Sequence, residues 1–273
     1  MEEPGGAGTL TLSDGTVMPL LGLGVWQIPD GRECVRAVRW ALELGYRHID
    51  TAQAYGNESS VGKALRESGL AREEVFITTK FQPTRRDPLV ELAHSIELLG
   101  VDYVDLYLIH WPARGATWAW PMMELTRGRS YTRAIGVSNF SVSELRQVVA
   151  GASSPPAVNQ VQFNPFAYRE ALLTECEHLD IALEAYSPLG TGRHLADPTV
   201  SSIADRLGRT PAQVLLRWCV QRAVPVLAKS TRFDRLEENA GVFDFALTAA
   251  DMARLDGLDR SGRSGEALER KWW

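Results

Sequence analysis

Eight short apolar segments, separated by stretches with helical character, constrain the fold of this chain more than any other feature of its sequence. Each segment is rich in Val, Ile, Leu or aromatic residues and is bounded by polar residues, Gly or Pro, which predicts a buried β-strand. Strands that alternate with helices and are apolar almost throughout predict an α/β protein with a parallel sheet covered by helices. The eight strands are predicted at residues 20–26, 47–52, 75–81, 104–110, 133–140, 157–163, 182–190 and 225–230.

The segments between the strands carry helix signals. Residues 87–100 open with Asp87 at an N-cap position and a proline in the first turn, and residues 141–151 begin with a capping box from Ser141 to Glu144. Eight strand–helix units in one chain fit a closed TIM-type (β/α)8 barrel better than an open sheet.

The segment before the first strand predicts a further element. Residues 9–19 alternate in polarity and turn at Asp14 and Gly15, which is typical of a β-hairpin, and we expect this hairpin to close the barrel floor. No linker or low-complexity segment is present, so we expect a single domain over residues 1–273.

Composition excludes several classes of partner. The chain is 45% hydrophobic and 23% charged with a net charge of −5, which is ordinary for a soluble protein and favours neither nucleic acid nor an anionic membrane. No apolar run approaches the ~20 residues that span a bilayer, and the N-terminus lacks a signal segment, so we expect a cytoplasmic protein. Three cysteines, far apart in the chain, indicate free thiols: Cys34, Cys176 and Cys219.

Ionisable side chains gather where three successive predicted strands end. Asp50 ends the second strand, Tyr55 lies in the loop after it, Lys80 ends the third strand and His110 ends the fourth. In this kind of barrel the carboxyl ends of the strands carry the chemistry, whereas the opposite face serves stability. One such residue would be read as a packed core residue, but four at one rim predict a site.

The four residue types indicate acid–base chemistry. A free tyrosine has a pKa of about 10, and a nearby ammonium such as that of Lys80 is expected to lower it. Asp50 would hold Lys80 and prevent it from being an unpaired buried charge. His110 would orient a substrate oxygen. Such a site can protonate an alkoxide as it forms, which is the second half of carbonyl reduction.

Carbonyl reduction also needs a hydride, which no side chain donates, so a nicotinamide cofactor is required. The Rossmann fingerprint is missing, because Gly22 and Gly24 are not followed by a third glycine at the right spacing. The last strand offers another anion site beside a helix start, and its charge favours NADPH over NADH. This site comprises Lys229, Ser230, Thr231, Arg232 and Arg235.

Taken together, these residues resemble the aldo-keto reductase family over nearly the whole chain. The matching motifs are LGLGVWQ, GYRHIDTAQAYGNE, TTK, LIHWP, AIGVSNFS, NQVQFNP, AYSPLGTG, KSTRFDRLEEN and FDFALT. The resemblance implies a monomeric barrel that reduces aldehydes and ketones reversibly with NADPH. It also implies that Asp50, Tyr55, Lys80 and His110 form a catalytic tetrad with Tyr55 as the general acid.

The resemblance further implies how cofactor and substrate are held. Ser138, Asn139 and Gln160 would bind the nicotinamide carboxamide, and Tyr186 would stack on its ring. Trp26 and Trp111 would wall the substrate pocket. The rest of the cofactor would lie along Ser187, Leu189, Gly190 and Thr191 at the pyrophosphate, Lys229, Ser230, Thr231, Arg232 and Arg235 at the 2′-phosphate, and Glu238 and Asn239 at the adenine.

Three departures from the family pattern bear on specificity. The loop after His110 is short and rich in tryptophan, and Ala228 stands where a proline often precedes the lysine. The tail ends in Trp272 and Trp273, which either fold over the pocket or pack on the barrel side. An aromatic, partly open pocket would suit small aromatic or aliphatic aldehydes and α-dicarbonyls.

Two other classes of function compete with a reductase. His48 and Asp50 share one face of a strand and superficially offer two metal ligands, but no complete ligand set accompanies them, so no metal is expected. A non-catalytic NADPH-binding sensor would keep the barrel and lose turnover. The intact tetrad favours an enzyme over a sensor.

Overall fold

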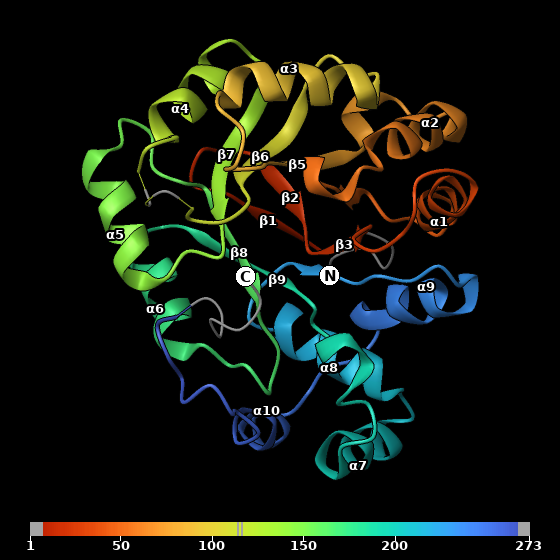
Figure 1. Ribbon diagram of the computed structural model, residues 1–273. Coiled ribbons are helices and arrows are strands. Elements are labelled where there is room, and N and C mark those ends of the chain that lie inside the picture. Colours follow the sequence, from red (N-terminus) through yellow and green to blue (C-terminus); the bar gives the residue numbers. More distant parts are fainter. Residues whose placement is uncertain (1–7, 114, 116, 267–273) are drawn as a thin grey trace.

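The computed structural model describes residues 8–113, 115 and 117–266. Within these residues, parallel strands close into an eight-stranded barrel surrounded by helices (Figure 1). The barrel is closed because the last strand pairs with both the first and the seventh. Each of the eight predicted strands overlaps one observed strand, which confirms the predicted fold class. In barrel order from the first, the strands are β3 (Leu21–Gly24), β4 (His48–Asp50), β5 (Phe76–Phe81), β6 (Val104–Ile109), β7 (Thr132–Ser138), β8 (Val158–Gln162), β9 (Ala182–Tyr186) and β10 (Val226–Leu227).

Helices follow the strands and form the outer ring. Among the described residues, one α-helix follows each strand from β3 to β8, two lie between β9 and β10, and two follow β10. Asp87 and the Ser141–Glu144 capping box begin their helices as predicted, through backbone N–H groups donated to Asp87 Oδ1 and Ser141 Oγ. The helices are α1 (Arg32–Glu43), α2 (Glu58–Ser68), α3 (Pro88–Leu99), α4 (Trp120–Gly128), α5 (Val142–Gly151), α6 (Glu170–His178), α7 (Pro198–Leu207), α8 (Pro211–Val220), α9 (Phe233–Ala240) and α10 (Ala249–Asp256).

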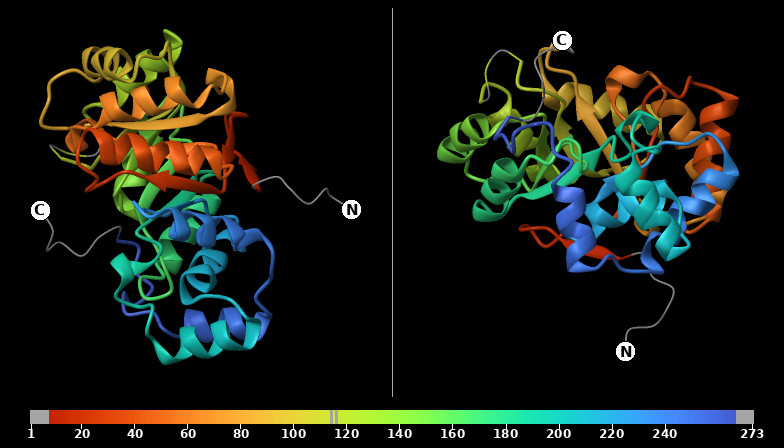
Figure 2. Two further views of the ribbon diagram at one scale, coloured as in Figure 1. Left: turned by 90° about the vertical axis from the view of Figure 1, so that its right-hand side faces the viewer. Right: turned by 90° about the horizontal axis from the view of Figure 1, so that it is seen from below.

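The predicted hairpin is present at one end of the barrel. Strands β1 (Thr9–Thr11) and β2 (Val17–Pro19) pair antiparallel and lie against the barrel end (Figure 2). Leu12 and Met18 are buried in one apolar cluster with barrel residues that include Phe76 and Leu106. The hairpin therefore closes the barrel floor with apolar side chains, which leaves the opposite rim for polar groups.

Alternation along the strands decides which side chains enter the barrel. On β4 the side chains of His48 and Asp50 point inward, and on β5 those of Thr78 and Lys80 do so. Ile49 on β4 and Ile77 on β5 alternate with these residues and belong to the larger apolar cluster that packs the barrel against its helices. The three cysteines are buried free thiols, as predicted. Among the described residues, no helix has the length and apolarity to span a bilayer.

Candidate active site

Lys80 is the centre of the polar cluster at the carboxyl ends of the strands. Its ammonium donates to both oxygens of Asp50, at 2.6 and 2.7 Å, and to the carbonyl oxygen of Thr51 at 2.9 Å. It also lies 3.3 Å from the Tyr55 hydroxyl. Lys80 and Asp50 come from the paired strands β5 and β4 and are both buried. Three of the four tetrad residues are thus brought together by hydrogen bonds.

A short 3₁₀ turn, Gln53–Tyr55, presents Tyr55 to the ammonium. The turn ends at Gly56, whose φ of 66° lies in the left-handed region that glycine adopts without strain. The Gln53 side chain accepts from the backbone N–H of Gln82 at 3.0 Å and donates to the Glu91 carbonyl at 3.1 Å. Tyr55 is therefore held on a turn that is tied to the next strand and its helix.

His110 completes the tetrad from the end of β6. Its ring packs edge-on against the Tyr55 ring, with the ring centres 5.6 Å apart, and lies beside Trp111. Its backbone N–H donates to the Phe81 carbonyl, and its own carbonyl accepts from the side chain of Asn139. Nδ1 of His110 is buried and has no hydrogen-bond partner among the described residues.

Burial and the Lys80 charge set the protonation states. Burial, followed by the Lys80 charge, holds the pKa of His110 well below its usual range, so the imidazole is neutral at pH 7. Burial raises the pKa of Asp50 against the opposing effect of Lys80. Burial alone would lower the pKa of Lys80, but Asp50 and Tyr55 outweigh it and the net pKa is raised. The two short hydrogen bonds from Lys80 to Asp50 are those of a buried ion pair.

The pKa of Tyr55 corrects one expectation from the sequence. The Lys80 charge does lower it, as predicted, but burial raises it by more, and Asp50 adds to the rise. The predicted net lowering is therefore wrong, because the sequence reveals a neighbouring ammonium but not the depth of burial. Tyr55 keeps its proton at neutral pH.

On the far side of the rim, β7, β8 and β9 bring four predicted cofactor residues together. The Tyr186 hydroxyl donates to the side-chain oxygen of Asn139 at 2.8 Å, and Ser138 donates to the Gln160 carbonyl at 2.9 Å. Gln160 points into the barrel, where its amide nitrogen donates to Asp50 at 2.9 Å and to Glu184 at 2.9 Å. Only the amide oxygen of Gln160 is left to face a cofactor.

The segment after β9 is tightly turned. Ser187, Gly190 and Thr191 have φ values of 49°, 56° and 57°, and Leu189 packs on the core. At Gly190 a Cβ would lie 2.2 Å from the His194 ring, so the close approach of that ring favours glycine there. Four predicted pyrophosphate residues therefore lie on one turn beside Tyr186.

The predicted anion site follows β10 and leads into α9. Lys229 and Arg235 are exposed and have no ion-pair partner within the described ranges, whereas Ser230 is buried and its Oγ accepts from the backbone N–H of Arg232 at 3.1 Å. The Arg232 guanidinium forms an ion pair with Asp234, which was not predicted from the sequence. Thr231 lies between them, partly buried.

The predicted adenine residues lie on α9. Glu238 accepts from the Thr210 hydroxyl at 2.5 Å, and Asn239 is buried. The backbone before the site is also tied down: the N–H of Ala228 donates to the Gly22 carbonyl at 3.0 Å, a bond that proline could not make.

The aromatic residues of the proposed pocket lie at the same rim. Trp26 follows β3 and is 51% exposed, and Trp111 is partly buried beside His110. Trp118, in the short loop after His110, donates to the Ala113 carbonyl at 2.8 Å. Trp272 and Trp273 lie outside the described residues.

Three buried polar residues that were not predicted from the sequence support the site. Asn57 accepts from Thr51 and donates to the carbonyls of Val25 and Ile28, so it joins the turn carrying Trp26 to the loop carrying Tyr55. Glu184 and His48 lie inside the barrel beneath the tetrad. A glutamate two residues before Tyr186, and so on the same inward face, was the available signal for Glu184.

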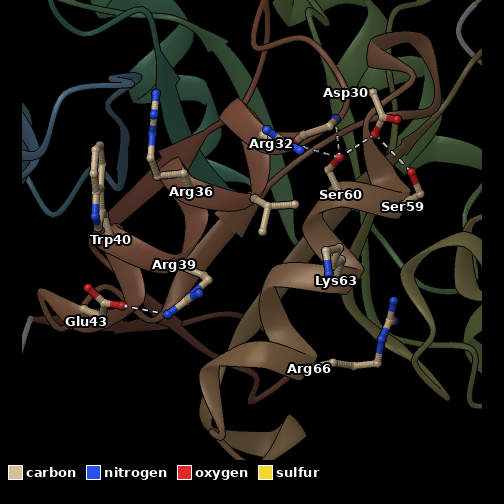
Figure 3. A pocket seen from close by; sticks show the side chains of 12 residues that line it. Asp30, Arg32, Arg36, Arg39, Trp40, Glu43, Ser59, Ser60, Lys63 and Arg66 are labelled. Carbon is tan, nitrogen blue, oxygen red and sulfur yellow. Dashed lines mark hydrogen bonds and ion pairs between the residues drawn. The ribbon is translucent and has the colours of Figure 1, made fainter.

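A separate surface groove of about 650 Å³ runs between α1 and α2 on the outside of the barrel (Figure 3). Its cations are partly matched by carboxylates, because Arg39 pairs with Glu43 and Lys63 with Glu67. None of the predicted site residues lines this groove, so it is distinct from the predicted anion site. The described residues hold no cluster of three or more metal-ligating side chains.

A parallel barrel with an acid–base cluster at the carboxyl ends of its strands is the arrangement of an α/β-barrel enzyme. The model of the Aldo/keto reductase family matches residues 20–260, and the chain belongs to that family. It is therefore an oxidoreductase of the class that reduces carbonyl compounds with a nicotinamide cofactor.

Individual relatives agree with this assignment. The chain is 45% identical over 265 residues to an aldo-keto reductase of Mycolicibacterium vanbaalenii, covering 93% of each chain. It is 42% identical over 263 residues to a 9,11-endoperoxide prostaglandin H2 reductase of Trypanosoma cruzi, covering 94% of this chain and 93% of that protein. An aldo/keto reductase structure from Brucella melitensis superposes with a TM-score of 0.90 at 40% identity, over 93% of this chain and 98% of the other.

Proposed function

We propose that this protein reduces small aldehydes and ketones with NADPH, and that Tyr55 is the general acid. One observation carries the proposal: the Tyr55 hydroxyl lies 3.3 Å from an ammonium that is itself held by both oxygens of Asp50. A phenol in this position can give its proton to a nascent alkoxide, because the ammonium stabilises the phenolate left behind.

The rim residues fit a nicotinamide dinucleotide. Exposed Lys229 and Arg235 flank the start of α9, where helix N–H groups also favour an anion, and Tyr186 is held by Asn139 at the other end of the rim. When bound, such a cofactor supplies the hydride. The cations at Lys229, Arg232 and Arg235 support NADPH over NADH, since the additional phosphate of NADPH is the group they would contact.

The chain's own residues have separate tasks in this proposal. Asp50 keeps the Lys80 ammonium charged and in place, and Lys80 stabilises the Tyr55 phenolate. His110, neutral at pH 7, presents a ring nitrogen that hydrogen-bonds the substrate oxygen. The raised pKa of Tyr55 ensures that the proton is present before the reaction begins.

The pocket wall supports a substrate class. Trp26 and Trp111 would contact the carbonyl substrate from two sides of the rim, which suits small aromatic or aliphatic aldehydes and α-dicarbonyls. A panel containing a short aliphatic aldehyde, a nitrobenzaldehyde, methylglyoxal, a keto sugar and a cyclic ketone tests this ranking. Equal rates across the panel would remove the substrate assignment and leave the reductase assignment intact.

The decisive test is the Tyr55→Phe variant, assayed for consumption of NADPH and of NADH. We expect turnover to fall by about 10²–10⁴-fold, the usual contribution of a positioned general acid, with cofactor affinity retained. Cofactor fluorescence measures that affinity separately. Binding without consumption by the unmodified protein would overturn the proposal in favour of a sensor, and undiminished turnover in Tyr55→Phe would remove Tyr55 from its role.

A further inference from the structure

Beneath the tetrad, the barrel holds a second layer of polar side chains. The amide nitrogen of Gln160 bridges two carboxyl groups, donating to Asp50 Oδ2 and to Glu184 Oε2 at 2.9 Å each. Asp50 Oδ2 also accepts from Lys80 at 2.7 Å. Glu184 is therefore joined to the tetrad through one amide group.

The other oxygen of Glu184 faces His48. Glu184 Oε1 and His48 Nδ1 lie 3.8 Å apart, and both side chains are fully buried. Neither atom has a hydrogen-bond partner among the described residues, whereas the other ring nitrogen of His48 lies 3.0 Å from the Thr78 hydroxyl. Gly22 makes room for the imidazole, since a Cβ there would lie 2.9 Å from the ring.

One proton accounts for both unpartnered atoms. A buried polar atom without a partner is destabilising, and a carboxyl O–H directed at a neutral imidazole nitrogen would satisfy both atoms after a small approach. An ionised Glu184 would instead put a second carboxylate beside Asp50, with the Lys80 ammonium acting on both of them. Burial and then Asp50 raise the pKa of Glu184 to about 8, and burial and then Lys80 lower the pKa of His48 to about 3.

We propose that Glu184 is a positioning residue of the tetrad. Its carboxyl group is protonated on the oxygen that faces His48, and its other oxygen accepts from the Gln160 amide and so holds that amide against Asp50. This inference rests on the proposed function, because its effect is exerted on Tyr55. The charged or titratable groups that act on Glu184 are His48 and Asp50 on β4, Lys80 on β5 and Tyr55 beyond β4. Loss of the Glu184 proton adds a negative charge that makes Tyr55 a weaker acid, so carbonyl reduction slows.

The first test needs neither cofactor nor turnover. Infrared spectra of the full chain at pH 7 should contain the C=O stretch of a protonated carboxylic acid that is absent from Glu184→Gln and that fades in the unmodified protein as pH rises through about 8. Glu58→Gln is the matched control, because Glu58 is a buried carboxyl on the outer side of the barrel wall, bonded to Thr79 at 2.6 Å. The Glu184 band must persist in that control. Its absence from the unmodified protein would overturn the proposal.

The second test is the pH dependence of kcat. A glutamine imitates a protonated glutamate, accepting from Gln160 and donating to His48, so Glu184→Gln should retain its rate at pH 7 within about threefold. Above pH 8 its kcat should exceed that of the unmodified enzyme by about threefold or more, since half a pKa unit at Tyr55 corresponds to that factor. Glu58→Gln should keep the unmodified profile.

The outcomes separate this inference from the proposed function. If the unmodified protein turns over but Glu184→Gln has the same alkaline profile, Glu184 does not position the tetrad and the inference fails alone. If the unmodified protein consumes no cofactor, the proposed function fails, and the infrared band still decides whether Glu184 carries the proton. Replacement of Glu184 by leucine provides a second check: it removes one of the two acceptors of the Gln160 amide and should lower kcat while cofactor affinity is retained.

Discussion

The predicted tetrad and the predicted anion site after β10 use charge in opposite ways. Lys80 and Asp50 are buried, and each is the other's ion-pair partner. Lys229 and Arg235 stand exposed beside a helix start, and Arg232 pairs with Asp234 in solvent, with both side chains about 60% exposed. One region holds its charges in a fixed arrangement out of water, and the other presents them to water.

This difference separates the two tasks of the proposed enzyme. A buried charge interacts strongly with its partner and destabilises the folded state when it is unpaired. Its position is therefore fixed, and removal of its partner has a large effect on stability. An exposed charge is screened, and one pair in water contributes little. Changes in the tetrad should therefore affect turnover and stability together, and changes in the anion site should affect cofactor affinity in a salt-dependent manner.

The largest effect should come from removing the buried cation. Lys80→Met leaves Asp50 as an unpaired buried carboxylate, so we expect the free energy of unfolding to fall by about 3–5 kcal/mol. Turnover should fall by about 10³-fold, because the Tyr55 phenolate loses its stabilising charge. Urea denaturation and steady-state kinetics measure the two losses.

The double variant Asp50→Asn, Lys80→Met is the control for that experiment. Replacing the carboxylate by an amide removes the unpaired charge, so much of the lost stability should return while turnover stays low. Equal stability of the single and double variants would mean that the pair is not desolvated, and the contrast between the two regions would fail.

A second large effect should appear in the pH dependence of stability. The pKa of His48 is about 6.5 in the unfolded chain but is lowered to about 3 in the folded protein, so the unfolded chain binds this proton at a higher pH. Stability therefore falls as pH falls through this window, by about 2–3 kcal/mol between pH 6.5 and 4.5 from this group. His48→Asn should remove that part of the slope in urea titrations at the two pH values. An unchanged slope would show that His48 is charged in the folded state.

A smaller effect is expected where the barrel meets the anion site. Ala228→Pro removes the hydrogen bond from Ala228 to the Gly22 carbonyl, so the free energy of unfolding should fall by about 1 kcal/mol. The KM for NADPH should change less than about twofold, because the cations themselves are untouched. A gain in stability would instead show that stiffening this segment outweighs the lost bond.

The smallest effect should come from freeing an exposed cation. Asp234→Asn removes the carboxylate that pairs with Arg232, so the KM for NADPH should fall by about twofold to threefold at low salt. The KM for NADH should not change, and the gain should vanish at high salt. Arg235→Ala is the opposing control and should raise the KM for NADPH alone. An equal change in the KM for NADPH and for NADH would show that Asp234 does not affect recognition of the 2′-phosphate.

Strand order made the centre of the tetrad predictable from the sequence. Asp50 and Lys80 lie at the ends of adjacent parallel strands, and the carboxyl ends of such strands meet at one rim, so their pairing can be expected from the sequence alone. The hairpin was equally predictable, because its alternation of polar and apolar residues and its Asp14–Gly15 turn are local sequence signals.

The features that the sequence did not predict depend on contacts across the barrel and on depth. Glu184 on β9 and His48 on β4 face each other across the barrel interior. Because these strands are not neighbours, no spacing in the sequence predicts the contact. The net rise in the pKa of Tyr55 depends on how far burial outweighs one nearby charge, and only the packed structure decides that. The Arg232–Asp234 pair is the exception, because its two residues are exposed and only two positions apart, so it could have been predicted from the sequence.

The bonds of Asn57 have a consequence for how this family member could diversify. Asn57 hydrogen-bonds the turn that carries Trp26 to the loop that carries Tyr55, so a change in this wall of the proposed pocket would also displace the proposed general acid. The opposite wall, after His110, belongs to a connection that makes no part of that bond set. We therefore expect substrate specificity to change through substitutions in the loop after His110, while the wall that carries Trp26 is retained.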